Sequence, residues 1–181
     1  MRNPPKEAGC NQPIRTGREP KDAALKDEIT FVRLTAVPAG EIAEHMSDPR
    51  LAAHLPLLKT AWDTRAAEQF VALKEQRWDQ DGLGHWAILL GGGYIGWGGF
   101  QKEEGEWDFG LVLCPDHFGL GRRVTKKALE LAKADARIPY VTFLLPPSRT
   151  KLGALARLGA RHVGEVVYDG ETFLKYRLET V

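Results

Sequence analysis

The chain has 181 residues, 43% of them hydrophobic, and its 25 Lys and Arg nearly balance its 24 Asp and Glu, for a formal net charge of +1. This length suits one domain with a sizeable core, and the balanced charge argues against a nucleic-acid-binding protein, which usually carries a strongly basic face. No apolar run approaches the roughly 20 residues that span a membrane, no secretory signal is apparent and only two cysteines are present, so we expect a cytoplasmic protein.

The first segment, residues 1–26, mixes prolines with charged and small residues and has little apolar surface to bury. We therefore expect a disordered polar tail there, because burial could not offset the entropy of ordering it. Residues 27–181 contain no internal repeat and no second boundary, and they are expected to form one domain.

The expected domain opens with an alternating strand over residues 29–34. One helical pattern follows Pro38, and a short second one follows Asp48-Pro49. A longer helix comes next, for which Asp63 or Thr64 is the candidate N-cap.

Three strands are expected next, over residues 86–90, 94–100 and 107–113. The short connections between them contain glycine, which is typical of an antiparallel meander. A helix is expected from Arg122 to Arg137, with its apolar side chains on one stripe.

The last part of the domain begins with an apolar and therefore buried strand over residues 140–145. Ser148 is expected to cap a helix that Gly159 ends, and residues 162–167 and 172–178 form a hairpin. The predicted fold class is α+β, with a single mixed, mostly antiparallel sheet of about seven strands covered by helices on both faces.

The segment Phe118-Gly119-Leu120-Gly121-Arg122-Arg123 carries the clearest chemical signal. A helix N-terminus offers unpaired N–H groups and a positive dipole end, and glycines let a ligand approach the backbone. Arginines at that end cost roughly 0.3–1 kcal/mol each unless an anion is bound. The third glycine of the dinucleotide fingerprint is absent, since residue 124 is Val. The residues alone leave a phosphate site and solvated arginines both open.

Residues 94–100, 107–113 and 118–123, together with Pro115, resemble the core of the GNAT acetyltransferase family. Residues 48–56 resemble the early helical segment of the branch that contains the Rim-type ribosomal-protein N-acetyltransferases. The resemblance covers nearly all of the expected domain.

The resemblance implies a GNAT fold in which a central pair of strands splays apart to admit acetyl-coenzyme A. It implies direct attack by a primary amine, from a protein N-terminus or a small molecule, in a ternary complex. No metal, nucleic acid or membrane is expected to take part, and the protein is expected to be a monomer or a homodimer. The coenzyme-binding residues that it implies are Leu111, Val112, Leu113, Phe118, Gly119, Leu120, Gly121, Arg122, Arg123 and Ser148.

The chain departs from the family pattern in the penultimate helix. Family members often have Asn at its start, then Ser, and in some a Tyr that protonates the departing thiolate, whereas this chain has Ser148, Lys151 and Leu155. Ser148 is the remaining candidate donor, although a Ser at a helix start is commonly only a cap. The departure keeps an alternative open: a non-catalytic module of the same fold that binds acyl-coenzyme A or a protein partner.

Asp108 is the candidate general base, since acyl transfer requires a neutral amine. It alternates with Gly110 and Val112, and a carboxyl group in such an apolar strand can have a raised pKa. An exposed strand residue is the competing interpretation. Cys114 has no basic partner nearby in sequence and is expected to pack at the strand end.

The remaining candidates are aromatic and imidazole side chains around the site. Trp62 is the candidate acceptor-binding residue, because it precedes the long helix that supplies substrate walls in the family. Trp86 and Trp97 are expected in the core. His85 and His117 are interpreted as solvated loop residues.

Overall fold

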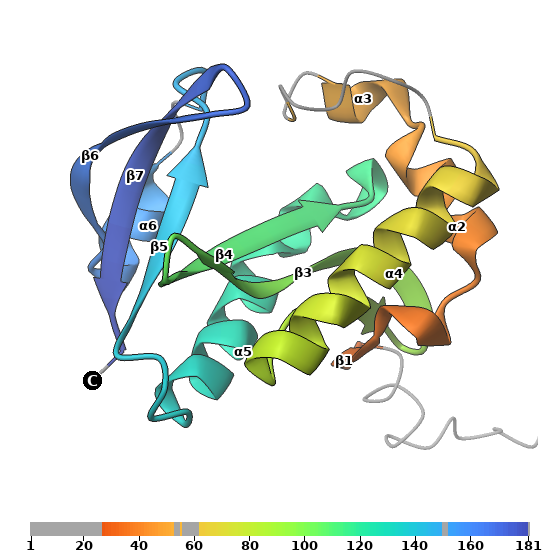
Figure 1. The fold of residues 1–181 in the computed structure, drawn as a ribbon, viewed down its shortest axis with the longest axis horizontal. Coiled ribbons are helices and arrows are strands. Elements are labelled where there is room, and N and C mark those ends of the chain that lie inside the picture. Colours follow the sequence, from red (N-terminus) through yellow and green to blue (C-terminus); the bar gives the residue numbers. More distant parts are fainter. Residues whose placement is uncertain (1–26, 53–54, 56–61, 150–151, 181) are drawn as a thin grey trace, which may run out of the picture.

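The computed structural model describes residues 27–52, 55, 62–149 and 152–180. The predicted tail, residues 1–26, lies outside these ranges, as do Lys151 and most of the segment before Trp62. One seven-stranded sheet organises the described part (Figure 1).

The strand order in the sheet is β1-β2-β3-β4-β5-β7-β6, and every neighbouring pair is antiparallel except β4–β5. This confirms the predicted α+β class and the mostly antiparallel mixed sheet. The strands are β1 (Ile29–Arg33), β2 (His85–Leu90), β3 (Gly93–Glu103), β4 (Glu106–Leu113), β5 (Tyr140–Leu145), β6 (Arg161–Tyr168) and β7 (Glu171–Glu179).

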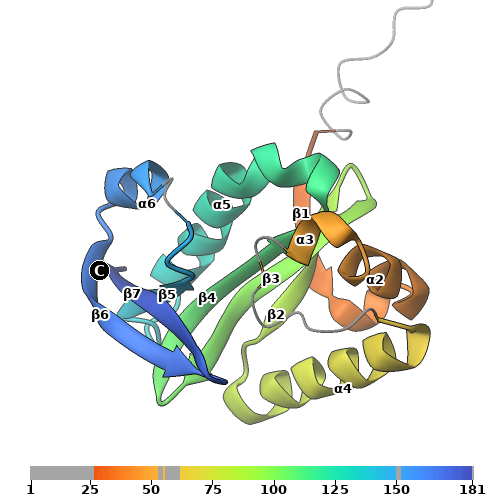
Figure 2. The same cartoon turned by 90° about the horizontal axis from the view of Figure 1, so that it is seen from above.

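Helices cover both faces of the sheet, with α5 and α6 on one side and α2 and α4 on the other (Figure 2). Among the described helices, none is long and apolar enough to cross a membrane. The helical elements are η1 (Leu34–Ala36), α2 (Ala39–Met46), α3 (Pro49–Ala52), α4 (Thr64–Asp81), η2 (Pro115–Leu120), α5 (Gly121–Lys133) and α6 (Gly153–Leu158).

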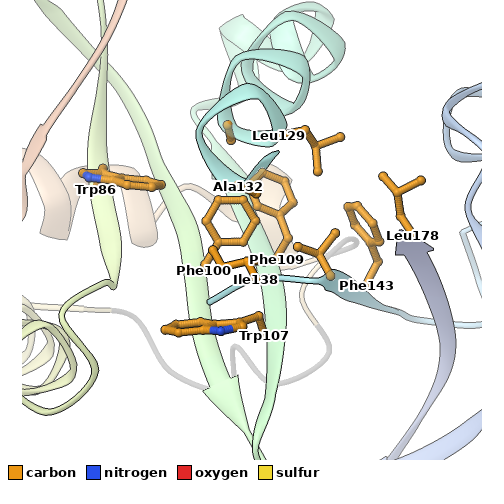
Figure 3. Packing of buried hydrophobic residues seen from close by; sticks show 11 residues of the cluster. Trp86, Phe100, Trp107, Phe109, Leu129, Ala132, Ile138, Phe143 and Leu178 are labelled. Atoms are coloured by element: carbon orange, nitrogen blue, oxygen red, sulfur yellow. The ribbon is translucent and has the colours of Figure 1, made fainter. Parts of the chain in front are cut away.

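The alternation of β4 divides its side chains between two cores, as the sequence predicts. Trp107 and Phe109 join Trp86 and Phe100 beneath α5, where the rings of Phe100 and Phe109 lie 5.2 Å apart (Figure 3). Val112 faces the other way and packs in the cluster of α2 and α4. Because strand side chains alternate, Glu106, Asp108 and Gly110 share the α4 face with Val112.

The two central strands separate soon after they meet. Asp108 and Thr142 are the one Cα pair that joins β4 to β5 among the described residues of these strands. By contrast, β3 and β4 stay paired from Glu103 and Glu106 to Gly96 and Leu113. The edge of β4 beyond Asp108 therefore lacks a ladder partner on β5, which confirms the splayed central pair.

Two predicted helix boundaries were wrong. Helix α5 ends at Lys133 rather than Arg137, because the Asp135 carboxylate accepts the Arg137 N–H at 3.0 Å and the resulting turn directs Ile138 into the core. Ser148 does not cap α6, which begins at Gly153 without a side-chain cap. Ser148 instead lies in an exposed turn directly after β5.

At the start of α4, Asp63 is the N-cap, and its side chain accepts the Ala66 N–H at 2.7 Å. At the far end, Gly82 adopts a left-handed conformation with φ 66° and closes the helix. The side-chain cap of Asp63 and the left-handed Gly82 are both common ways to end a helix, and together they fix the length of α4 over its face of the sheet.

Candidate functional site

A cavity of about 610 Å³ lies where β4 and β5 separate. Its lining residues come from both faces of the sheet. Phe109, Leu111 and Phe143 belong to the α5 face, whereas Asp108 and Gln101 belong to the α4 face. The cavity therefore passes through the sheet at the splay, and its two ends have different chemistry.

The first end lies at the N-terminus of α5. Gly119, Gly121 and Arg122 line it, with Thr125 one turn further on. The helix starts without a capping side chain, and its first turn contains no acidic residue. Because α5 continues directly from η2, the Gly121 N–H already donates to the Phe118 carbonyl. What this terminus offers an anionic group is its positive dipole end and the exposed Arg122. A Cβ at Gly119 would meet no atom within 4 Å, so the space before it is open.

The predicted coenzyme-binding residues divide into two groups. Those that line the cavity are Leu111, Val112, Phe118, Gly119, Gly121 and Arg122. Leu113, Leu120, Arg123 and Ser148 are described but are not among the lining residues. Leu113 and Leu120 pack with Val124 under the start of α5.

Arg123 is held at the edge of the domain. Its Nη1 lies 3.0 Å from Asp27 Oδ1, and its Nη2 donates to the Asp27 carbonyl at 2.8 Å. The two neighbouring arginines are therefore differently placed, because Arg122 faces the cavity and Arg123 is paired. A role for Arg123 or Ser148 toward the coenzyme stays a prediction.

Asp108 lies where the cavity passes from one face of the sheet to the other. Its Oδ1 accepts the Thr142 hydroxyl at 2.9 Å, across the single β4–β5 pair. The pKa of Asp108 is raised to about 7, chiefly by burial; the Thr142 hydrogen bond opposes the shift, and the nearby Glu103 charge adds to it. The carboxyl group therefore exchanges a proton near neutral pH, as a general base must.

A polar chain continues from Asp108 along the α4 face. Gln101 lies directly opposite Asp108 in the β3–β4 register. The Gln101 Oε1 accepts the Lys74 ammonium at 2.7 Å, and the Gln101 Nε2 donates to Glu103 Oε1. All four side chains line the cavity, and burial lowers the pKa of Lys74 to about 8.

His85 completes this end of the cavity. Its side chain is buried, and a Cβ added at Gly110 would lie 3.4 Å from its Nε2, so the glycine leaves room for the ring. Its Nδ1 has no hydrogen-bond partner among the described residues. Burial and the nearby Lys74 charge hold the pKa of His85 well below its usual range, so the imidazole is neutral.

The aromatic and imidazole expectations need correction. His85 is not a solvated loop residue but the buried first residue of β2. Trp86 lies in the core as predicted, and the half-buried Trp97 packs against the α2 and α4 cluster while also lining the cavity. Trp62 packs its ring 5.0 Å from Phe70 and is not among the lining residues, so its acceptor role stays a prediction.

Sequence reasoning missed Lys74, Gln101 and Glu103. The strand pairing could have found Gln101, because a hairpin from residue 103 to residue 106 places it opposite Asp108. Nothing local marks Lys74, which reaches the site through the packing of α4 on the sheet.

Cys114 is half-buried outside the lining, and burial raises the pKa of its thiol to about 11. Within the described ranges, no three His, Cys, Asp or Glu residues are grouped so as to hold a metal ion.

The chain matches the family model described as "Acetyltransferase (GNAT) domain" over residues 28–160. No curated protein sequence matches it. Among solved structures, it is similar to a putative GNAT-family acetyltransferase from Bordetella pertussis, with 18% identity and a TM-score of 0.66, covering 84% of this chain and 96% of that one.

Two further structures share the fold. The spermidine N-acetyltransferase from Vibrio cholerae, solved with coenzyme A and spermine, is 11% identical with a TM-score of 0.67, covering 84% of this chain and 95% of that one. The ribosomal-protein-S5-alanine acetyltransferase from Vibrio fischeri is 13% identical with a TM-score of 0.67, covering 84% of this chain and 92% of that one.

Proposed function

The chain belongs to the GNAT acetyltransferase family, and we propose that it transfers an acetyl group from acetyl-coenzyme A to a primary amine by direct attack in a ternary complex. One observation carries the proposal. A single cavity joins an uncapped, basic helix N-terminus to a carboxyl group whose pKa is about 7. An anionic donor and an amine acceptor could therefore meet between β4 and β5.

The coenzyme end fits the donor in two respects. The pyrophosphate would lie at the positive end of the α5 dipole, and Arg122 would neutralise part of its charge. The pantetheine arm carries amides, and the edge of β4 beyond Asp108 has no partner on β5. An extended amide chain can bind to such a free strand edge by main-chain hydrogen bonds.

Asp108 is the proposed base. The Thr142 hydroxyl uses Oδ1, and Oδ2 has no donor among the described residues, so Oδ2 can accept a proton from the amine. The neutral nitrogen then forms a bond to the thioester carbon, and the carbon–sulfur bond breaks. The nitrogen loses its second proton, which passes through water to the departing thiolate, so the products are the amide and the free thiol of coenzyme A. Backbone N–H groups on the free edge of β4 would polarise the thioester carbonyl.

Direct attack is favoured over a covalent enzyme intermediate. Cys114 is the one described cysteine, and the raised pKa of its thiol leaves little thiolate at neutral pH. Leu155, at the position where some relatives have Tyr, lines the cavity with an apolar side chain. Catalysis would then rest on positioning and on Asp108, because a thiolate leaves without a dedicated acid.

Several finer expectations stay predictions. They are membership of the Rim-type branch, a cytoplasmic location, the choice between a monomer and a homodimer, and the absence of a metal or nucleic-acid partner. The likeness to the Vibrio fischeri protein supports the shared fold, and the branch assignment rests on residues 48–56 and the Gly119/Gly121 motif.

Calorimetry with coenzyme A, followed by thiol-release assays with a panel of primary amines, tests the proposal. We expect saturable binding and release of thiol with at least one amine. No binding at millimolar coenzyme would contradict the proposed function. Binding without thiol release on any amine would instead favour the non-catalytic module.

A further inference from the structure

The acceptor end of the cavity contains the half-buried ammonium group of Lys74. Lys74 lines the cavity from α4, and its Nζ donates to Gln101 Oε1 at 2.7 Å. The rings of Phe70 and Trp97 lie 5.5 and 5.6 Å from the same atom. Within the described ranges, Lys74 forms no ion pair with a carboxylate.

This environment only partly offsets the cost of removing a charge from water. Cation–π contacts contribute about 0.5–2 kcal/mol, and a neutral amide supplies one hydrogen bond. Burial nevertheless lowers the pKa of Lys74, and the Glu103 charge beyond Gln101 opposes that shift only in part. Buried charges are normally paired, and an anionic ligand group would pair this one.

His85 gives independent evidence for a polar ligand group on the same side of the cavity. Its side chain lines the cavity, it is buried, and its Nδ1 lacks a partner among the described residues. A neutral imidazole has one N–H donor and one acceptor nitrogen. The charge of Lys74 lowers the pKa of His85, so the two groups lie close together.

The opposite charge lies on the other side of Gln101. The Gln101 amide is oriented by two hydrogen bonds. Its Oε1 accepts from Lys74 Nζ, and its Nε2 donates to Glu103 Oε1. Asp108 faces Gln101 directly, and residues so paired lie about 5 Å apart. This side of the cavity therefore has a cation, Lys74, at one end of the Gln101 amide and the carboxylates of Asp108 and Glu103 at the other end.

We propose that the acceptor is a small amine that also carries a carboxylate, as an amino acid does. Lys74 and His85 would bind the carboxylate, Asp108 would meet the amine nitrogen, and Glu103 would add negative charge on the amine side. The proposal deepens and rests on the proposed acetyl transfer. Lys74 is then a specificity-determining residue, and Asp108 alone meets the reacting nitrogen.

Two features define the acceptor more closely. Trp97, Leu144 and Phe173 contribute apolar surface to the same side of the cavity, which suits an apolar side chain on the amino acid. A polyamine such as spermine, which the Vibrio cholerae structure contains, would bring positive charge against Lys74. We therefore expect spermidine to be a poor acceptor here.

The test compares leucine, leucinamide and 3-methylbutylamine, which differ only in the carboxyl group, by thiol release at saturating acetyl-coenzyme A. In parallel, calorimetry measures binding of N-acetylleucine and N-acetylleucinamide to the protein loaded with coenzyme A. We expect the acid to exceed the amide at least tenfold in both measurements, and Lys74→Met to reduce that ratio to about one. Lys133→Met, about 18 Å along α5 from the helix start, should leave the ratio unchanged.

The outcomes separate the two claims. If coenzyme A binds and amines are acetylated, but the acid has no advantage or Lys74→Met keeps it, the inference is wrong and the proposed function stands. If no amine is acetylated, the calorimetric ratio decides, and equal or absent binding of the acid overturns the inference. If coenzyme A does not bind, both claims fail.

Discussion

The two ends of the cavity are built in different ways. The end at α5 comes mainly from one continuous segment, residues 118–125, which offers the positive end of a helix dipole and Arg122. The end at α4 collects side chains from α4, β2, β3 and β4, each brought there by packing or strand register. A short local segment is enough to bind a group that is the same in every donor molecule, such as the coenzyme A pyrophosphate. Selectivity for the acceptor depends instead on contacts between residues far apart in the sequence, which can vary without altering the fold.

If the ends have these separate roles, Asp108→Asn should cause the largest loss. Asn keeps an acceptor for Thr142 but cannot take a proton, so we expect kcat to fall about 10²–10⁴-fold. Coenzyme A affinity, measured by calorimetry, should change less than threefold. A variant with nearly full activity would remove Asp108 from the chemistry.

A smaller effect should separate the two arginines at the coenzyme end. Arg122→Gln should weaken coenzyme A binding about tenfold, a change of about 1.4 kcal/mol, because Arg122 lines the cavity. The matched change Arg123→Gln should weaken it much less, because Arg123 is paired with Asp27. Equal losses in calorimetry would mean that both arginines contact the coenzyme.

A change confined to the acceptor end should alter acceptor use alone. In Gly110→Ala the new methyl group would lie 3.4 Å from His85 Nε2, so the ring must move by a few tenths of an ångström. We expect the KM for the amine to rise a few-fold while coenzyme A affinity stays constant. A changed coenzyme affinity with an unchanged KM would reverse the assignment of the two ends.

The smallest functional effect is expected outside the cavity. Asp63→Ala removes the N-cap of α4 and should lower the free energy of unfolding by about 1 kcal/mol. The kinetic constants should stay within twofold of the wild type. Denaturant titration together with thiol release would check both, and a large rise in KM would show that the cap also positions Lys74.

The fold was largely predictable because its signals are local. The alternation in residues 107–113 separates the two faces of β4 correctly, and the glycine-bearing turns predict the meander. The end of α5 was not predictable from helical periodicity, because a side-chain bond from Asp135 and the burial of Ile138 decide it. Ser148 has the chemistry of a cap but lies in a turn, since the chain after β5 continues to Gly153 before α6 begins.

The candidate site was predictable only in part, for the same reason. Asp108 follows from an acid within an apolar strand, and its raised pKa agrees with that argument. Lys74 and His85 acquire their roles from the packing of α4 and from the space above Gly110. No spacing in the sequence specifies these contacts, because the residues are joined only when the sheet and helix assemble.

The pH dependence of kcat/KM for the amine acceptor tests the central claim most directly. Because the pKa of Asp108 is about 7, its base form is lost as the pH falls through that value. We predict that activity declines below about pH 7 in the wild type and that this inflection is absent from the residual activity of Asp108→Asn, while any inflection of the amine itself persists. The same inflection in both proteins would contradict the account.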